Sequence, residues 1–340
     1  MNVISLFDGM GIGLLALINA GKRNFTYYRV EIDKKANDAF RHFFTDEFLR
    51  RYGVKVIHHN DVCKFPPMIE YNIQILEHEG VDLLLAGSPC QGFSIAGNQL
   101  NFEDPRSKLF FEFIRIRDLY KPKYFLLENV KMKQEFSDVI DDYCGPHYEI
   151  DSAEFTAQQR KRLYWTNIWV KSWPTPSPLV VEDILEEEVD DKYFIEPRRA
   201  ITICDNECAK RKIGFIGTDS MGNRIYSIHG KSVTLIANAG GLGGKTGLYA
   251  LPCLSPDRAE KRQNGRRFKP PRSKFYTLTT IDRHGVLVGN HIRKLTPREC
   301  ERLQGWPDDM TIGAGSDNAR YKICGNGWTE PVIRHILSFM

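Results

Sequence analysis

Short apolar runs alternate with longer amphipathic stretches through the first half of the chain. The short runs predict strands at 3–7, 27–31, 54–58, 81–86 and 124–128. The longer stretches predict helices at 14–20, 35–50, near 69–79 and at 108–120. The run at 81–86 is dominated by Leu, Val and Ala, as in a parallel strand that is covered on both faces. This alternation predicts an α/β fold with a doubly wound, mostly parallel sheet.

The pattern changes near the prolines at 174–178. From there to about residue 290 the chain has short β-like runs and many glycines, and one further short helix is predicted at 331–339. A length of 340 residues suits about two domains. We therefore expect a larger α/β unit followed by a smaller, irregular, β-rich unit.

Composition excludes several classes of protein. A hydrophobic content of 42% and a charged content of 26% are typical of a soluble globular protein. No apolar stretch approaches the ~20 residues that span a bilayer, and no basic leader precedes the first strand. The eight cysteines lack the spacing of a disulfide scaffold, which indicates reduced thiols in a cytoplasm. Cys204 and Cys208 have no second pair at zinc-site spacing, so we expect no metal.

One cysteine has the setting of a reactive thiol. Pro89-Cys90-Gln91 follows the apolar run at 81–86 and is flanked by Gly87 and Gly92. In open α/β sheets, ligands bind and chemistry occurs at the carboxyl ends of such strands. The alternative is a structural cysteine, buried as a small apolar residue. The polar, glycine-flanked setting favours a nucleophile.

The turn after the first strand has the composition of a ligand-binding loop. It reads Phe7-Asp8-Gly9-Met10-Gly11-Ile12-Gly13, and its glycines allow a close approach of the backbone to a ligand. Glu31 follows roughly 20 residues later, where an acid binds ribose hydroxyls. The glycine spacing is not G-x-G-x-x-G, which argues against NAD and leaves another adenosine cofactor. Asp61 is a candidate for the adenine amino group. The alternative for each acid is a solvated loop residue.

A basic run at 257–274 dominates the charge distribution, although the net charge is only +4. Because glycine and prolines interrupt the run, it is a loop that suits a phosphate backbone, the alternative being a solvated surface. Its basic residues are Arg258, Lys261, Arg262, Arg266, Arg267, Lys269, Arg272 and Lys274. The segment 239–246 loosely fits a phosphate-binding loop but opens no helix, so we interpret it as a flexible loop against DNA.

Taken together, the motifs make the chain resemble the cytosine-C5 DNA methyltransferases over essentially its full length. The motifs are the turn at 7–13, the cysteine segment at 87–94, Glu128-Asn129-Val130, Gln158-Gln159-Arg160-Lys161-Arg162, the segment 293–309 with Glu301-Arg302-Leu303-Gln304-Gly305-Trp306-Pro307, and Gly325-Asn326. The first motif and the ending from Trp328 to His335 also resemble the vertebrate de novo enzymes. The cysteine segment and Gly325-Asn326 have the commoner bacterial forms, and we expect a stand-alone bacterial or phage enzyme.

The resemblance implies a mechanism and a cofactor. Cys90 is expected to attack C6 of a flipped-out cytosine, Glu128 to act at N3, and Arg162 and Arg160 to hold O2. Pro89 and Gln91 belong to the same catalytic segment, and Gln91 is a candidate for filling the gap in the duplex. S-adenosylmethionine is the implied methyl donor. Its expected contacts are Phe7, Asp8, Gly9, Gly13, Glu31, Ile32, Asp61, Val62, Leu109 and Asn326.

The implied partner is double-stranded DNA. The expected DNA contacts are Gln91, Ser94, Gly241, Lys245, Arg258, Lys261, Arg262, Arg266, Arg267 and Lys269. We expect a Rossmann-like catalytic domain at 1–165, completed by 320–340, a target-recognition domain at 166–292 and a bridging segment at 293–319. A cognate restriction endonuclease is a candidate partner, and we expect a monomer. The alternatives are a tRNA cytosine methyltransferase and a catalytically silent DNA-binding regulator.

If the basic run follows phosphates, neutralising Arg266 and Arg267 together weakens binding to all DNA sequences alike. The salt dependence becomes flatter, by about one unit of log–log slope for each phosphate that the protein no longer neutralises. Binding titrations at several salt concentrations measure both effects. Changed methylation sites with an unaltered slope would instead indicate base readout by these arginines, worth roughly 1–3 kcal/mol per bidentate pair.

Overall fold

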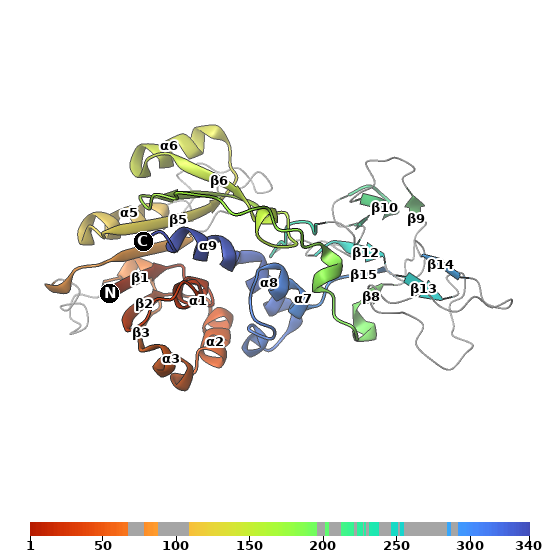
Figure 1. The fold of residues 1–340 in the computed structure, drawn as a ribbon, viewed down its shortest axis with the longest axis horizontal. Helices are drawn as coiled ribbons and strands as arrows, with labels where there is room; N and C mark the ends of the chain where they lie inside the picture. The colour runs from red at the N-terminus through yellow and green to blue at the C-terminus, as the bar shows by residue number, and fades with distance from the viewer. Residues whose placement is uncertain are drawn as a thin grey trace.

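A seven-stranded sheet forms the centre of the larger lobe (Figure 1). The computed structural model describes residues 1–66, 78–87, 109–195, 201–203, 212–220, 223–226, 228, 231–237, 246–250, 252–254, 284–286 and 292–340. The strands are β1 (Asn2–Leu6), β2 (Phe25–Val30), β3 (Val54–His59), β4 (Leu83–Gly87), β5 (Tyr124–Val130), β6 (His147–Asp151) and β7 (Lys161–Thr166). Their order is β3-β2-β1-β4-β5-β7-β6.

The predicted fold class is confirmed. Strands β1 to β5 pair in parallel, whereas β7 runs antiparallel to both of its neighbours. The strand order reverses between β1 and β4, because the chain moves outward through β2 and β3 before it returns to β4. Such a switch point opens a crevice at the carboxyl ends of the strands, where ligands of this fold class bind.

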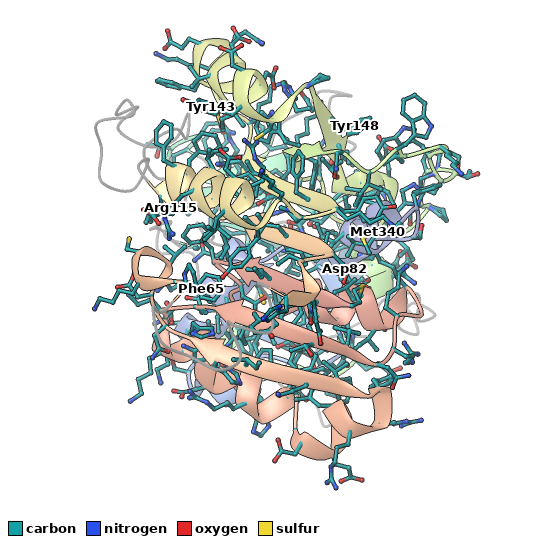
Figure 2. All side chains as sticks on the ribbon, turned by 90° about the vertical axis from the view of Figure 1, so that its left-hand side faces the viewer. Phe65, Asp82, Arg115, Tyr143, Tyr148 and Met340 are labelled. Atoms are coloured by element: carbon teal, nitrogen blue, oxygen red, sulfur yellow. The ribbon has the colours of Figure 1, made fainter. Side chains whose placement is uncertain are left out.

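Both faces of the sheet are buried, which explains the apolar run at 81–86. Leu83 and Leu85 belong to one hydrophobic cluster, and Leu84 and Ala86 belong to the other. The first cluster includes α1 (Ile12–Asn19) and α9 (Glu330–Leu337), and the second includes α5 (Leu109–Tyr120) and α6 (Gln134–Cys144). Figure 2 shows side chains on both sides of the strands.

The prediction of a single helix at 35–50 is wrong, because the chain forms two helices there. They are α2 (Lys34–Phe43) and α3 (Asp46–Tyr52). Thr45 separates them, and its hydroxyl accepts a hydrogen bond from the Phe48 backbone N–H at 3.2 Å, which caps α3. The helix predicted near 69–79 lies mostly outside the described residues. The sequence analysis did not anticipate α6, β6 or β7.

A smaller, six-stranded sheet lies at the other end of the molecule (Figure 1), which confirms the β-rich unit. Its strands, in spatial order, are β8 (Phe194–Ile195), β15 (Ile292–Arg293), β12 (Leu248–Ala250), β11 (Arg224–Tyr226), β10 (Lys212–Ile216) and β9 (Ile201–Ile203). A separate pair consists of β13 (Pro252–Leu254) and β14 (His284–Val286). The domain boundaries drawn from the sequence stay predictions.

Two helices that the sequence analysis missed lie between the sheets. These are α7 (Pro297–Leu303) and α8 (Asp317–Asn326) (Figure 1). Beyond them the chain returns to the larger lobe, where α9 packs against α1. Short 3-10 helices complete the described elements: η1 (Val62–Lys64), η2 (Ser152–Glu154), η3 (Val181–Ile184), η4 (Asp191–Tyr193) and η7 (Ile312–Ala314). Among the described helices, none is long and apolar enough to cross a membrane.

A fully buried ion pair supports the first turn of the larger lobe. Arg29 on β2 donates to the Asp8 carboxylate at 2.8 Å, and the two side chains are 1% and 0% exposed. The same guanidinium donates to the Gly9 carbonyl at 2.6 Å and lies over the ring of Phe40. Tyr27 donates to the other Asp8 oxygen at 2.5 Å. The turn therefore keeps one conformation.

We predict that Arg29→Met lowers the free energy of unfolding by about 3–5 kcal/mol, because it leaves the Asp8 carboxylate buried without its ion-pair partner. Chemical denaturation measures the loss. The matched control is Arg41→Met, since Arg41 is 61% exposed and its ion pair with Asp38 spans 3.7 Å. Arg41→Met is expected to lower the free energy of unfolding by at most about 1 kcal/mol. Equal losses in the two variants would contradict the assignment.

Candidate active site

A cavity of about 530 Å³ opens at the carboxyl ends of β1, β2, β4 and β5. This is the place that the strand order predicts, and the volume lies in the range of small-molecule sites. Residues expected from the sequence to act on cofactor or base line it: Phe7, Asp8, Gly9, Glu31, Ile32, Asp61, Val62, Leu109, Glu128, Arg160, Arg162 and Asn326. Gly13 lies instead within α1, where an added Cβ would meet the Leu85 side chain at 2.7 Å.

Glu31 closes the turn between β1 and α1. Its Oε2 accepts a hydrogen bond from the Gly9 N–H at 2.7 Å, and its Oε1 accepts one from the Asp33 N–H at 2.6 Å. Burial raises the pKa of this carboxyl group, and the two backbone N–H donors lower it in part. Gly9 has φ 59°, a left-handed conformation that favours glycine. The carboxylate and the turn therefore form one unit at the cavity.

The other expected adenosine contacts surround the same space. Ile32 lines the cavity although it is 76% exposed, so it offers a bare apolar surface. Asp61 caps η1, because its Oδ1 accepts a hydrogen bond from the Cys63 N–H at 3.0 Å. Arg115 on α5 donates to the Val62 and Phe65 carbonyls at 3.2 and 2.5 Å, which anchors η1 (Figure 2).

Glu128 lies at the inner side of the cavity, near the end of β5. It is in register with Gly87 on β4 and with Tyr164 on β7. Arg162 approaches its Oε1 at 3.2 Å, and the Trp328 indole N–H donates to its Oε2 at 3.1 Å. Burial raises the pKa of the carboxyl group above its usual value, and Arg162 lowers it in part. Glu128 therefore binds a proton more readily than an exposed glutamate.

The guanidinium group of Arg160 binds backbone carbonyl oxygens of two other segments of the chain. It donates to the carbonyl oxygens of Leu235, Gly325 and Gly327 at 3.2, 3.0 and 3.1 Å, and it is almost fully buried. Its charge also lowers the pKa of Glu128. Arg162, by contrast, forms an ion pair, and its partner is the expected catalytic carboxyl group of Glu128.

Several expected residues lie outside the described part of the chain. Pro89, Cys90, Gln91 and Ser94 are among them, but Gly87, three residues before Cys90, lines the cavity. The expected DNA contacts Gly241, Lys245, Arg258, Lys261, Arg262, Arg266, Arg267 and Lys269 also lie there. So do Cys204 and Cys208. Within the described ranges, no group of three or more His, Cys, Asp or Glu side chains could hold a metal ion.

The structure brings two further groups to the cavity that the sequence analysis did not select. Trp328 contacts Glu128, and Lys322 on α8 donates to the Asp33 carboxylate at 2.7 Å. Trp328 and Lys322 lie close to the end of the sequence, whereas their partners lie in its first half, so only the fold brings them together. The position of Trp328 directly after Gly325-Asn326-Gly327 was the one available signal.

A doubly wound sheet with a cavity at its switch point is the Rossmann-like arrangement that binds nucleotide-containing cofactors. The family model for C-5 cytosine-specific DNA methylases matches residues 1–340, and the chain belongs to this family. It is therefore a DNA cytosine-5 methyltransferase. This confirms the family and the activity that the motifs predicted.

Several curated relatives of the chain come from phages and bacteria. The orphan methyltransferase M.SPRI of Bacillus phage SPR is 30% identical, with 99% of this chain and 96% of the relative covered. The type II methyltransferase M.HhaI of Haemophilus parahaemolyticus is 28% identical, with 99% and 93% covered. Among solved structures, a Spodoptera frugiperda DNMT2 variant is similar with a TM-score of 0.60 at 19% identity, covering 99% and 98% of the two chains. At that identity the likeness concerns the fold alone.

Proposed function

We propose that the cavity binds S-adenosylmethionine and that Cys90, Glu128 and Arg162 carry methyl transfer to a cytosine flipped out of duplex DNA. The observation that carries this proposal is the largely buried pairing of Glu128 with Arg162 beside Gly87, which precedes Cys90 by three residues. A carboxyl and a guanidinium group can together hold N3 and O2 of a cytosine ring, one as a proton donor and the other as a cation.

The residues present fit S-adenosylmethionine. Glu31 offers a partly buried carboxylate for ribose hydroxyls, and Ile32 and Val62 offer apolar surface for the adenine ring. Asp61 lies in the same cavity with a carboxylate for the adenine amino group. When bound, this cofactor supplies an electrophilic methyl group. Its product after transfer is S-adenosylhomocysteine.

The protein groups divide the work at the base. C5 of cytosine is a weak nucleophile, and the Cys90 thiolate activates it by adding to C6. Glu128 donates to N3 as the negative charge develops there, and its burial favours the protonated form that this step needs. Arg162 holds O2. After the methyl group has been transferred, a base removes the C5 proton and the Cys90 sulfur is eliminated from C6.

The target atom is out of reach inside a duplex, so the base must leave the stack at a cost of roughly a few kcal/mol. We assign to Gln91 and the following loop the role of filling the gap that the flipped base leaves in the duplex.

We further propose a catalytic domain at 1–165 completed by 320–340, a recognition domain at 166–292 and a bridging segment at 293–319. The phage and bacterial relatives support action in the cytoplasm of a bacterial or infected cell. Monomeric state and a cognate endonuclease stay predictions.

The test is transfer of a tritiated methyl group to duplex DNA and, separately, to tRNA. We expect label in DNA and none after Cys90→Ser, since an alcohol is a far weaker nucleophile than a thiolate. DNA binding should persist. Cys144→Ser is the matched control, because burial raises the pKa of that thiol to about 12 and it lies away from the cavity. Cys90→Ser turnover within tenfold of the unaltered enzyme would contradict the assignment.

Two other outcomes of this assay separate the alternatives. Label in tRNA but not in DNA would assign the enzyme to the RNA-modifying branch. Binding of DNA without any label would indicate a silent regulator. Bisulfite sequencing of plasmid DNA from an expressing host identifies the methylated site.

For the cofactor, we predict that Glu31→Ala weakens S-adenosylmethionine binding by about 1–3 kcal/mol, because ribose hydroxyls lose a charged acceptor. Isothermal calorimetry measures the change. Asp82→Ala is the control, since Asp82 also accepts a backbone N–H, from Asn2 at 2.7 Å, but lies at the amino end of β4, away from the carboxyl ends that line the cavity. Unchanged affinity in Glu31→Ala would mean that the ribose is held elsewhere.

A further inference from the structure

Trp328 places its indole ring against the expected catalytic carboxyl. It lies in the short connection between α8 and α9 and lines the cavity. Its Nε1–H donates to Glu128 Oε2 at 3.1 Å, across 200 residues of sequence. Arg162 approaches the other oxygen, Oε1, at 3.2 Å. One oxygen of the carboxyl group therefore accepts a hydrogen bond from the indole, and the other forms an ion pair with the Arg162 guanidinium group, so the two contacts together orient the carboxyl group.

The same indole ring covers the end of the neighbouring strand. A Cβ added at Gly87 would lie 2.7 Å from the Trp328 Nε1 and 3.2 Å from its Cε2. Gly87 is directly opposite Glu128 in the parallel register of β4 and β5. The ring thus spans the carboxyl ends of both strands. Only a residue without a side chain at position 87 leaves room for it.

The backbone of Trp328 is held from several sides. Its carbonyl accepts the Trp306 indole N–H at 3.0 Å, and Gln304 donates to the Cys324 carbonyl at 2.5 Å. Arg160 donates to Gly325 and Gly327 just before it. The indole therefore approaches Glu128 from a fixed support. A loosely held surface side chain could not orient a carboxyl group in this way.

We infer that Trp328 is a positioning residue, which orients the Glu128 carboxyl group toward the target base through its indole N–H. The segment that contains Gln304 and Trp306 acts through it by fixing its backbone. The inference rests on the proposed function, because it assumes that Glu128 acts on the cytosine ring. An indole N–H can only donate, so Trp328 cannot replace Glu128 as the proton donor to N3, and its effect is confined to orientation and proton affinity.

The test is the pH dependence of single-turnover methyl transfer by Trp328→Phe. Phenylalanine keeps an aromatic ring and removes the N–H. A hydrogen bond to the ionised carboxylate lowers its pKa, so its loss raises the pKa of Glu128. Because the protonated form acts at N3, the alkaline limb of the rate profile should move to higher pH. The maximal rate should fall about 10-fold to 100-fold through misorientation.

Trp165→Phe is the matched control. Trp165 is buried on β7, and its indole N–H donates to the Asp141 carboxylate at 2.6 Å, outside the cavity. This variant loses the same kind of bond without touching Glu128, so its pH profile should match that of the unaltered enzyme. Thermal unfolding and S-adenosylmethionine affinity of both variants separate general damage from the specific effect.

Glu128→Gln provides the coupling test. If the indole acts through Glu128, adding Trp328→Phe to Glu128→Gln should change the rate less than twofold. Equal losses in the two backgrounds, with an unmoved pH profile, would reduce Trp328 to a packing role and overturn the inference. An unchanged rate in Glu128→Gln alone would instead contradict the catalytic role of Glu128, so the two failures are distinguishable.

Gly87→Ala is a second variant that tests the same inference if Trp328→Phe fails to fold. The added methyl group displaces the indole while Trp328 itself is unchanged. We expect the same upward movement of the alkaline limb and a rate loss of similar size. An unmoved profile in Gly87→Ala, with the enzyme folded and binding cofactor, would also overturn the inference.

Discussion

The buried guanidinium group of Arg160 joins three segments on which the active site depends. Its hydrogen bonds reach Leu235, ahead of the smaller sheet's β12, and Gly325 and Gly327, at the end of α8. A buried cation is costly unless its N–H groups are satisfied, so the three carbonyls must stay where they are. This one group therefore fixes the turn that presents Asn326 and Trp328 to the cavity and joins that turn to the chain entering β7.

The helices between the two sheets support the same turn through buried charges. Glu299 pairs with Arg293 at 2.6 Å and also accepts the Thr296 N–H, so one carboxylate caps α7 and anchors β15. Glu301 pairs with Arg320 on α8 at 2.9 Å. Such pairs gain little net stability over apolar packing, but breaking one is expensive. They give the junction of the two lobes a specific geometry, which a purely apolar contact would define less well.

Features of the fold and the site that depend on residues close together in the sequence could be predicted, whereas those that depend on contacts between distant residues could not. Leu83 to Ala86 showed a covered strand because burial acts on every residue of the run, and Glu31 could be recognised by its distance from the glycine turn. The antiparallel β7 and the break at Thr45 were missed, since both depend on pairing and capping that periodicity does not record. The contact of Trp328 with Glu128 spans 200 residues and arises only when α9 returns to α1.

The register of two strands brings the expected acid Glu128 beside Gly87, which precedes the expected nucleophile in the sequence. Glu128 lies inside β5, where the sheet fixes its backbone, and Gly87 lies opposite it as the last residue of β4. Gly87 is thus the described residue nearest in sequence to the expected nucleophile, which follows three residues later. The carboxyl group can therefore serve as a fixed reference for the base. The indole of Trp328 covers Gly87 and donates to Glu128, so it links the end of β4 to the carboxyl group on β5.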